Sequence, residues 1–332
     1  MSKWLILCAI PLFTTLILSR LVIHYFGKRL LDTPNARSSH QIPTPRGGGA
    51  ALACGVIITL LIAWSLGYVS AAALYWLLIP SGLIAALGIC DDLFNLSVGI
   101  RLTVQFLLSG LGLFFIGEQS ELSQPIQIFS AGIMILFIVW MTNLYNFMDG
   151  INGLAALQAI SVCVGMALVY WIHSTNTNAI HLLIIISAST CGFLFWNFPH
   201  AKLFMGDSGS LFLGLSFGLL TVESLNEGIH FVVAWLIMLG VFIVDASYTL
   251  FYRLITKQAV HQAHRSHTYQ KISIKYNSHT RVTLVTVAIN LLWLLPIAIA
   301  STTKQLHYIA ALLIAYAPLL WLANKFHAGR AE

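Results

Sequence analysis

The stretch AAALYWLLIPSGLIAALGICDD, residues 71–92, decides the fold. Residues 71–90 contain no charged side chain, and Asp91 and Asp92 follow them directly. An α-helix needs roughly 20 predominantly apolar residues to cross the hydrocarbon core of a bilayer. The stretch therefore predicts a transmembrane helix that ends on two adjacent carboxylates.

The composition of the whole chain supports the same interpretation. Hydrophobic residues make up 58% of the 332 residues and charged residues only 8%, whereas soluble domains carry about 25% charged residues. No long polar segment, low-complexity tract or clear repeat divides the chain. The sequence therefore predicts an all-α polytopic integral membrane protein, with residues 1–332 as a single transmembrane domain.

About eleven apolar segments are long enough to span a membrane. The connections between them alternate between two sets, of which one is short and plain and the other holds nearly all the polar residues. The expected spans are residues 4–23, 49–68, 71–90, 101–117, 128–146, 152–172, 179–197, 208–224, 229–250, 281–300 and 305–323.

The basic residues indicate the orientation. All Lys and Arg residues except Lys3 and Lys304 belong to the polar set of connections or to the C-terminal end. By the positive-inside rule this face is cytoplasmic, which places the N-terminus outside, the C-terminus inside and the polar site at the cytoplasmic face. Because the net charge of +6 is not gathered in one patch, membrane lipids rather than nucleic acid are the expected partners.

The pair Asp91 and Asp92 opposes the macrodipole of the helix that it ends, on the face otherwise marked by positive charge. If the backbone there is helical, neighbouring side chains point about 100° apart, so the two carboxylates need not bind one ion. Asn95 then shares a face with Asp91. One carboxylate can face a phosphate or its metal while the other holds a cation or the loop; a solvated helix end is the alternative.

Asp207 stands at the start of a predicted span, in FMGDSGSLFLGLSFG, residues 204–218. Magnesium takes oxygen ligands and usually keeps waters and substrate phosphates, so one or two protein carboxylates suffice. Asp207 fits such a role. A helix cap is the alternative.

Four polar residues follow at intervals of three in NLYNFMDGING, residues 143–153: Asn143, Asn146, Asp149 and Asn152. On a helix they form one polar stripe, which suits recognition of a nucleobase or a sugar amide. A polar seam between helices is the alternative. Asp245, inside a predicted span, is a further site candidate by default.

The segment HQAHRSHTYQ supplies three histidines and one arginine: His261, His264, Arg265 and His267. No carboxylate or thiolate stands near enough in sequence to complete a zinc site, and the basic flanks favour phosphate binding. A loop lying on anionic lipid headgroups is the alternative. Arg46 and Lys202 are interpreted in the same way, as anion contacts or as residues of the positive-inside pattern.

Together these segments resemble the polyprenyl-phosphate N-acetylhexosamine-1-phosphate transferases, which start lipid-linked synthesis of bacterial cell-envelope glycans. The resemblance rests on four features in the family's order: DDLFN at 91–95, NLYNFMDGINGLA at 143–155, NFPHAKLFMGDSGSLFLG at 197–214 and the His-containing last polar loop. They cover most of the chain between about residues 32 and 270.

The resemblance implies a catalytic domain in the bacterial inner membrane that uses Mg²⁺, with Mn²⁺ as the alternative ion. Undecaprenyl phosphate attacks the β-phosphate of a UDP-N-acetylamino sugar, which gives the lipid-diphosphate-sugar and UMP. The loop HRSHTYQ is more similar to the branch that starts O-antigen chains than to the peptidoglycan branch. The sequence does not fix the oligomeric state, so a homodimer stays open beside a monomer.

By the same likeness, Asp91 contacts or deprotonates the lipid phosphate, Asp92 supports the site and its metal, and Asp207 binds the metal with the diphosphate. Phe204 is expected to stack on uracil. The other expected substrate-binding residues are His264, Arg265 and His267 for phosphate or sugar, with Arg46, Asn95, Asn146, Asp149, Gly150, Asn152, Asn197 and Lys202.

The chain departs from the family at one position, because several members resemble D-G-x-D-G where Asn152 here replaces the second carboxylate. This argues against a second metal contact there. A secondary transporter of an anionic solute is the alternative function, although transporters place coupling groups near mid-bilayer on paired repeats. A lipid-binding scaffold is another, which would not need Asp91, Asp92 and Asp207 together.

Overall fold

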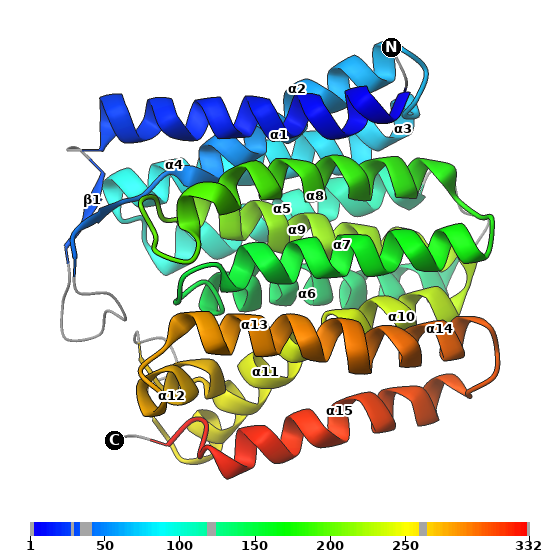
Figure 1. Ribbon diagram of the computed structural model, residues 1–332. Helices are drawn as coiled ribbons and strands as arrows, with labels where there is room; N and C mark the ends of the chain where they lie inside the picture. Colours follow the sequence, from blue (N-terminus) through cyan, green and yellow to red (C-terminus); the bar gives the residue numbers. More distant parts are fainter. Residues whose placement is uncertain (1–2, 28–29, 34–41, 118–123, 259–263, 331–332) are drawn as a thin grey trace.

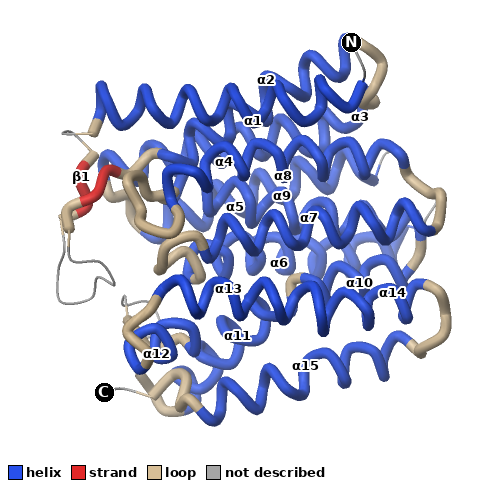
Figure 2. The backbone as a smooth tube through the Cα atoms, viewed as in Figure 1, coloured by secondary structure: helices blue, strands red, loops and turns tan. Residues whose placement is uncertain are grey.

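Long apolar helices make up most of the chain, and the loops between them gather at two opposite ends of a bundle (Figure 1, Figure 2). The computed structural model describes residues 3–27, 30–33, 42–117, 124–258 and 264–330. Its elements are α1 (Lys3–Leu21), η1 (Val22–Phe26), β1 (Leu31–Asp32), β2 (Thr44–Pro45), α2 (Gly48–Ser65), α3 (Ala71–Ala73), η2 (Leu74–Leu78), α4 (Ile79–Phe94), α5 (Val98–Gly117), α6 (Gln124–Phe147), α7 (Leu154–Ile172), α8 (Thr177–Asn197), α9 (Asp207–Glu223), η3 (Ser224–Glu227), α10 (Ile229–Met238), α11 (Gly240–Ile255), α12 (Thr268–Lys275), α13 (His279–Ile289), η4 (Asn290–Leu294), α14 (Leu295–Thr302) and α15 (Tyr308–Lys325).

The prediction of an all-α polytopic membrane protein is confirmed. Within the described ranges, ten helical segments are long and apolar enough to cross a membrane, and the bent pair α10–α11 makes an eleventh. Accordingly, α1 begins and α15 ends at opposite ends of the bundle (Figure 1). We call the end that carries β1 and α12 the polar end.

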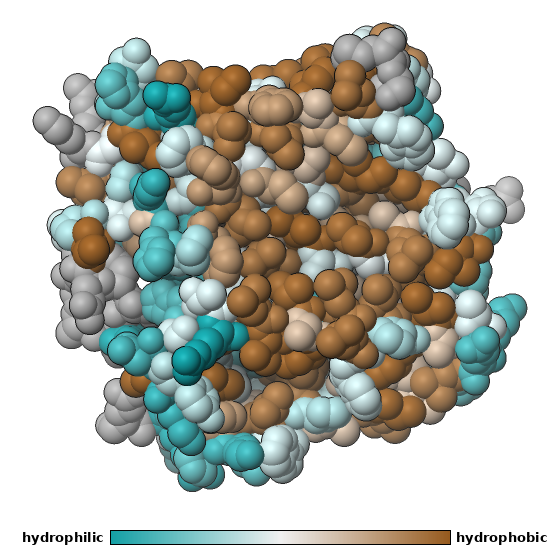
Figure 3. All heavy atoms as spheres, in the orientation of Figure 1, coloured by the Kyte–Doolittle hydropathy of each residue, from teal (hydrophilic) through white to brown (hydrophobic). Residues whose placement is uncertain are grey.

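The surface matches this interpretation. On the face shown in Figure 3, apolar residues fill the centre, and hydrophilic residues gather at both ends, most densely near β1 and α12. Large apolar side chains are left exposed along the spans, among them Phe13 (56% exposed), Trp171 (70%) and Leu292 (78%). Such side chains are stable in contact with lipid chains, which are as apolar as they are.

Helix α9 forms the core of the bundle and packs against α2, α4 and α6. Every residue from Ser208 to Val222 is buried. The small residues of α9 allow this, since a Cβ atom on Gly214 would lie 2.7 Å from the Cα of Thr142 in α6. Because α9 begins with Asp207, the core helix starts on a carboxylate at the polar end.

Helices α10 and α11 meet at an elbow of 72°. A break inside a bilayer frees backbone groups that need internal partners. The Met238 carbonyl accepts a hydrogen bond from Gln158 Nε2 at 3.3 Å, and Asn290 Nδ2 donates to Gln158 Oε1 at 2.6 Å. These two amides stabilise the elbow, which directs α11 toward α12 and the polar end (Figure 1).

A short hairpin covers part of the polar end. Strand β1 pairs with β2 in antiparallel register, with Leu31 opposite Pro45 and Asp32 opposite Thr44. The backbone N–H of Phe204 donates to the Pro45 carbonyl at 2.8 Å, which joins the hairpin to the α8–α9 loop. Residues 34–41, between the two strands, lie outside the described residues.

Candidate functional site

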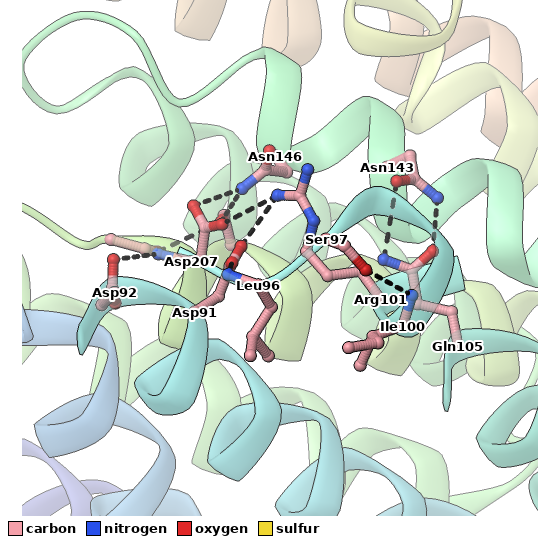
Figure 4. A network of polar contacts seen from close by, with 12 residues as sticks. Asp91, Asp92, Leu96, Ser97, Ile100, Arg101, Gln105, Asn143, Asn146 and Asp207 are labelled. Atoms are coloured by element: carbon pink, nitrogen blue, oxygen red, sulfur yellow. Dashed lines mark hydrogen bonds and ion pairs between the residues drawn. The ribbon is translucent and has the colours of Figure 1, made fainter. Parts of the chain in front are cut away.

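Three helix ends bring acidic and amide side chains together at the polar end (Figure 4). Asp91 lies in the last turn of α4, Asn146 in the last turn of α6 and Asp207 at the start of α9. Asn146 Nδ2 donates to Asp207 Oδ1 at 2.8 Å. Arg101 Nη1 lies 2.8 Å from Asp91 Oδ2 and 3.5 Å from Asp207 Oδ2, so one guanidinium bridges both carboxylates.

Asp91 is held as an anion by two donors. Its side chain is 6% exposed. Oδ2 accepts from Arg101, while Oδ1 accepts from the Leu96 N–H at 2.7 Å. Helix α4 ends at Phe94, and Asn95 takes a left-handed conformation with φ of 50°. Asn95 is therefore outside the helix, and the helical face that the sequence assigned to Asp91 and Asn95 does not extend to it.

Asp92 points to different partners from Asp91. Its Oδ1 accepts from the Asp207 N–H at 3.2 Å and its Oδ2 from the Ser208 N–H at 3.4 Å. The two neighbouring carboxylates thus have separate protein partners, a contact of either with phosphate or metal stays a prediction, and the cap of α9 is Asp92 rather than Asp207. A carboxylate has about four lone-pair sites, so Asp92 can accept more than these two hydrogen bonds. The metal contact expected of Asp92 stays a prediction.

Gly88 explains how Asp92 reaches the start of α9. A Cβ atom on Gly88 would lie 2.4 Å from the Cα of Ser208, so only glycine allows the two helices to approach this closely. Asp92 follows Gly88 by four residues and shares its face of α4. The negative charge of Asp92 also complements the positive end of the α9 macrodipole.

The carboxylate oxygens of the site are ligands that suit a hard cation. Asp91 and Asp207 both direct an oxygen at the one positive group of Arg101. No cluster of three or more His, Cys, Asp or Glu side chains fits a metal within the part of the chain that the structure describes. Magnesium needs few protein ligands because it keeps waters and takes substrate phosphate oxygens. The carboxylate oxygens present therefore fit magnesium, and the metal contacts expected of Asp207 and Asp92 stay predictions.

The four polar residues spaced three apart do not form one helical stripe. Helix α6 ends at Phe147, so Asp149 and Asn152 lie in the turn before α7. Asn143 Nδ2 donates to Gln105 Oε1 at 2.6 Å, which is the polar seam between helices that was the alternative. Of the four, Asn146 alone bonds Asp207 among the hydrogen bonds of the described residues.

Asp149 lies close to the acidic cluster. Burial, reinforced by the negative charge of Asp92, raises the pKa of Asp149 to about 7, and Arg46 partly opposes this shift. A carboxyl with this pKa is half-charged near neutral pH. Arg46 itself is paired with Asp32 at 2.9 Å, so its nearest anion belongs to the hairpin.

Two asparagines brace the loop between α8 and α9. Asn197 is buried and bonds the backbone at both ends of its amide, donating to the Leu203 carbonyl at 2.9 Å and accepting from the Gly153 N–H at 2.7 Å. Asn152 Nδ2 donates to the Pro199 carbonyl at 3.1 Å. An aspartate could not donate this bond, which gives a structural reason for the amide at this position.

A polar hollow of about 690 Å³ opens beside these loops. Its volume lies within the range of roughly 300–1,000 Å³ that small-molecule sites occupy. Lys202 is exposed near it, and Gly150 faces Tyr269, whose hydroxyl would collide with a side chain at that position. The lining includes Asn152, His200, Phe204, Arg265, Asn277 and His279.

The segment His264–His267, which we call the HRSH loop, forms one wall of this region. The rings of His264 and His267 stack with centroids 5.0 Å apart, and Ser266 Oγ bonds His264 Nδ1 at 2.9 Å. Burial, the neighbouring His267 and Arg253 lower the pKa of His264 to about 4, so His264 is neutral at pH 7. Arg265, in contrast, carries a permanent positive charge. His261 lies outside the described residues.

Asp245 supports the HRSH loop from within. It accepts hydrogen bonds from the backbone N–H groups of Thr268 (2.8 Å) and Tyr269 (3.0 Å), and its Oδ1 lies 3.5 Å from His267 Nδ1. These bonds cap α12 directly after the loop. The intramembrane acid singled out in the sequence thus has a structural role, as the group that fixes where the loop ends.

Asp245→Ala is expected to lower the thermal unfolding midpoint in detergent, because it removes a helix cap worth about 1–2 kcal/mol. Differential scanning fluorimetry measures this. Thr249→Val is the matched control, since it removes only the hydroxyl that donates to Asp245 at 3.2 Å. Equal midpoints for wild type and Asp245→Ala would contradict the capping role.

Sequence reasoning missed Arg101 and Gln105 as members of the site network. The signal for Arg101 was present, because it is a basic residue at the start of a span, ten positions after Asp91. By sequence alone, however, Arg101 counts only toward the positive-inside pattern. Gln105 follows one turn later on the same helical face.

Fold and site together define a polytopic membrane protein with a carboxylate-rich polar site at one end of its helix bundle. Residues 74–225 match the family model described as glycosyl transferase family 4. These residues include Asp91, Asp92, Asn146 and Asp207, whereas the HRSH loop follows them.

Three relatives identify the family more closely. The chain is 31% identical over 295 residues to a probable undecaprenyl-phosphate N-acetylglucosaminyl 1-phosphate transferase of Bacillus subtilis (strain 168), which covers 82% of this chain and 79% of the relative. It is 30% identical over 310 residues to an undecaprenyl-phosphate alpha-N-acetylglucosaminyl 1-phosphate transferase of Escherichia coli (strain K12), covering 86% and 81%. A Thermotoga maritima protein of the same name is 28% identical over 260 residues, covering 76% and 77%. The chain belongs to the polyprenyl-phosphate N-acetylhexosamine-1-phosphate transferase family.

Proposed function

We propose that the protein transfers an N-acetylhexosamine 1-phosphate from a UDP-sugar to undecaprenyl phosphate and releases UMP. The observation that carries this proposal is the convergence of Asp91, Asn146 and Asp207 around Arg101 at the end of the core helix. Transfer between two phosphorylated anions needs cationic groups and alignment more than covalent chemistry by the protein. UDP-N-acetylglucosamine is the first donor to test, because all three relatives carry that sugar in their names.

In the proposed reaction, an oxygen of the lipid phosphate forms a bond to the β-phosphorus of the donor, and the bond to the bridging oxygen breaks so that UMP leaves. A phosphate monoester has a second pKa near 6 and is already nucleophilic at neutral pH. Asp91 is paired with Arg101, which favours a role in positioning rather than in removing a proton. Arg265 and the hollow beside Phe204 are suited to the donor's phosphates and nucleoside.

Magnesium, when bound, would neutralise charge on the diphosphate. The residues proposed to hold it are Asp207 and Asp92, with Asp91 and Arg101 beside them and Mn²⁺ as a substitute ion. We further propose that the polar end faces the cytoplasm of a bacterial inner membrane, with the N-terminus periplasmic. We also propose that the product starts an O-antigen or a related cell-envelope glycan. The likeness of the HRSH loop sequence to the branch that starts O-antigen chains supports this.

The test is UMP release by detergent-purified protein given undecaprenyl phosphate, Mg²⁺ and a panel of UDP-N-acetyl sugars. Omission of lipid and addition of chelator are the two controls. Release that needs both lipid and metal supports the transferase. Folded protein that releases no UMP with any sugar would contradict it and favour transport or lipid binding alone.

The pKa of Asp149 predicts a pH effect. Because this pKa is about 7, Asp149 gains charge beside the anionic donor as pH rises from about 6 to about 8, so KM for the UDP-sugar is expected to increase. The raised pKa of Asp149 also affects stability. Between about pH 4 and pH 7 the folded state binds more protons at Asp149 than the unfolded state, so the free energy of unfolding falls as pH rises through this range. Steady-state kinetics across this range should show a flatter KM profile for Asp149→Asn; an unchanged profile would assign the titration to another group.

A further inference from the structure

The end of the chain packs against the back of the HRSH loop. We call residues Phe326–Arg330, which follow α15, the C-terminal turn. The N–H of Gly329 donates to the Ser266 carbonyl at 2.8 Å. The Gly329 carbonyl accepts from Gln258 Nε2 at 3.1 Å, and Gln258 Oε1 accepts from Arg253 Nη1 at 3.0 Å. A single glycine thus connects the loop to the end of α11.

The fit around Gly329 admits no side chain. Its φ of +79° lies in the left-handed region, which costs other residues roughly 1 kcal/mol or more. A Cβ atom there would lie 2.8 Å from the Thr249 carbonyl oxygen and 2.9 Å from the Cβ of Tyr252. The preceding residue, Ala328, is 1% exposed. Any larger residue must therefore displace the C-terminal turn from α11.

The position of Arg265 depends on this backbone. Within the described residues, Arg265 Nε is buried and has no hydrogen-bond partner, so no side-chain contact of that atom fixes the guanidinium. The loop is instead held directly after Arg265. The Gly329 N–H donates to the Ser266 carbonyl, and the N–H groups of Thr268 and Tyr269 donate to the Asp245 carboxylate.

We propose that Gly329 is a positioning residue that acts through Arg265, so that the C-terminal turn fixes the cation that contacts the donor's diphosphate. This inference rests on the proposed function. A contact made equally in the ground state and the transition state changes KM and leaves kcat unaltered. Displacing the turn is therefore expected to weaken donor binding without slowing turnover at saturation.

The experiment compares Gly329→Ala with Gly67→Ala in purified full-length protein. Gly67 has a similar φ of +72°, but a Cβ atom there would meet nothing within 4 Å, so this control introduces the same backbone strain without displacing a neighbour. Gly329→Ala is expected to raise KM for UDP-N-acetylglucosamine about five-fold, the equivalent of about 1 kcal/mol. Its kcat and its KM for undecaprenyl phosphate should stay within about two-fold of the wild-type values. For Gly67→Ala, kcat and both KM values should stay within the same range.

A coupling test separates positioning from general destabilisation. In an Arg265→Ala background, Gly329→Ala should cause no further rise in KM, because the residue through which it acts is gone. Additive increases would overturn the proposal, as would an unchanged KM for both Gly329→Ala and Gln258→Ala in an active enzyme. Gln258→Ala serves if Gly329→Ala does not fold; it is expected to raise KM about three-fold, because it removes the side-chain hydrogen bonds that join the Gly329 carbonyl to Arg253. A wild-type protein that releases no UMP contradicts the proposed function itself.

Discussion

Asp207→Asn is expected to lower kcat/KM for UMP release at least about 100-fold, the scale of losing a preorganised electrostatic group. The amide keeps the size of the side chain but has no negative charge. It also faces Asn146 Nδ2, which now donates to Asp207 Oδ1, and Arg101, which lies 3.5 Å from Asp207 Oδ2. The NH₂ group of the new amide would face one of these two donors, or the amide would rotate away from them. Either arrangement disrupts a site that is built to hold an anion.

Steady-state UMP release measures this effect, and Mg²⁺ titration should show weaker activation. Glu227→Gln is the matched control, because it makes the same chemical change on the segment that follows α9 at its far end. Turnover of Asp207→Asn close to that of Glu227→Gln would remove Asp207 from the catalytic machinery.

Arg101→Met is expected to have the second-largest effect, about 100-fold in kcat/KM, together with a lower unfolding midpoint. Methionine keeps most of the volume but leaves Asp91, which is 6% exposed, without its ion pair. Breaking a buried pair costs about 3–5 kcal/mol. Since Arg101 is 31% exposed, solvent screening reduces this to about 1–2 kcal/mol.

Arg101→Lys separates charge from geometry, because lysine keeps the charge but cannot bridge two carboxylates with a planar fork. An intermediate activity is expected. Arg20→Met, at an exposed position in α1, controls for removal of a basic residue. Wild-type activity and stability in Arg101→Met would show that the bridge is incidental.

The membrane architecture was predictable because each span is marked locally by its own apolar run. Asp91, Asn146 and Asp207 were also recognisable, since an acid or an amide at the end of an apolar run stands out from its neighbours. The different directions of Asp91 and Asp92 followed from helical geometry alone. The proposed functions of these residues stay predictions that the variants above will test.

The rest depended on contacts between distant segments. The sequence spacing suggested a single stripe from Asn143 to Asn152, but α6 ends at Phe147 and divides it. Nothing local indicates that Asp92 caps a helix that begins at Asp207, or that Asp245 caps α12. The hydrogen bond from Gly329 to Ser266 joins residues 63 positions apart, and no local sequence pattern predicts it.

The elbow between α10 and α11 has a consequence for biogenesis. Gln158 enters the bilayer early in synthesis, yet its acceptor oxygen is bonded by Asn290, from a span that emerges more than a hundred residues later. Buried polar groups in lipid need partners, so the elbow reaches its final form only after η4 has been inserted. Since α11 leads from the elbow to Asp245 and the HRSH loop, a nascent chain acquires its complete site only after η4 has been synthesised.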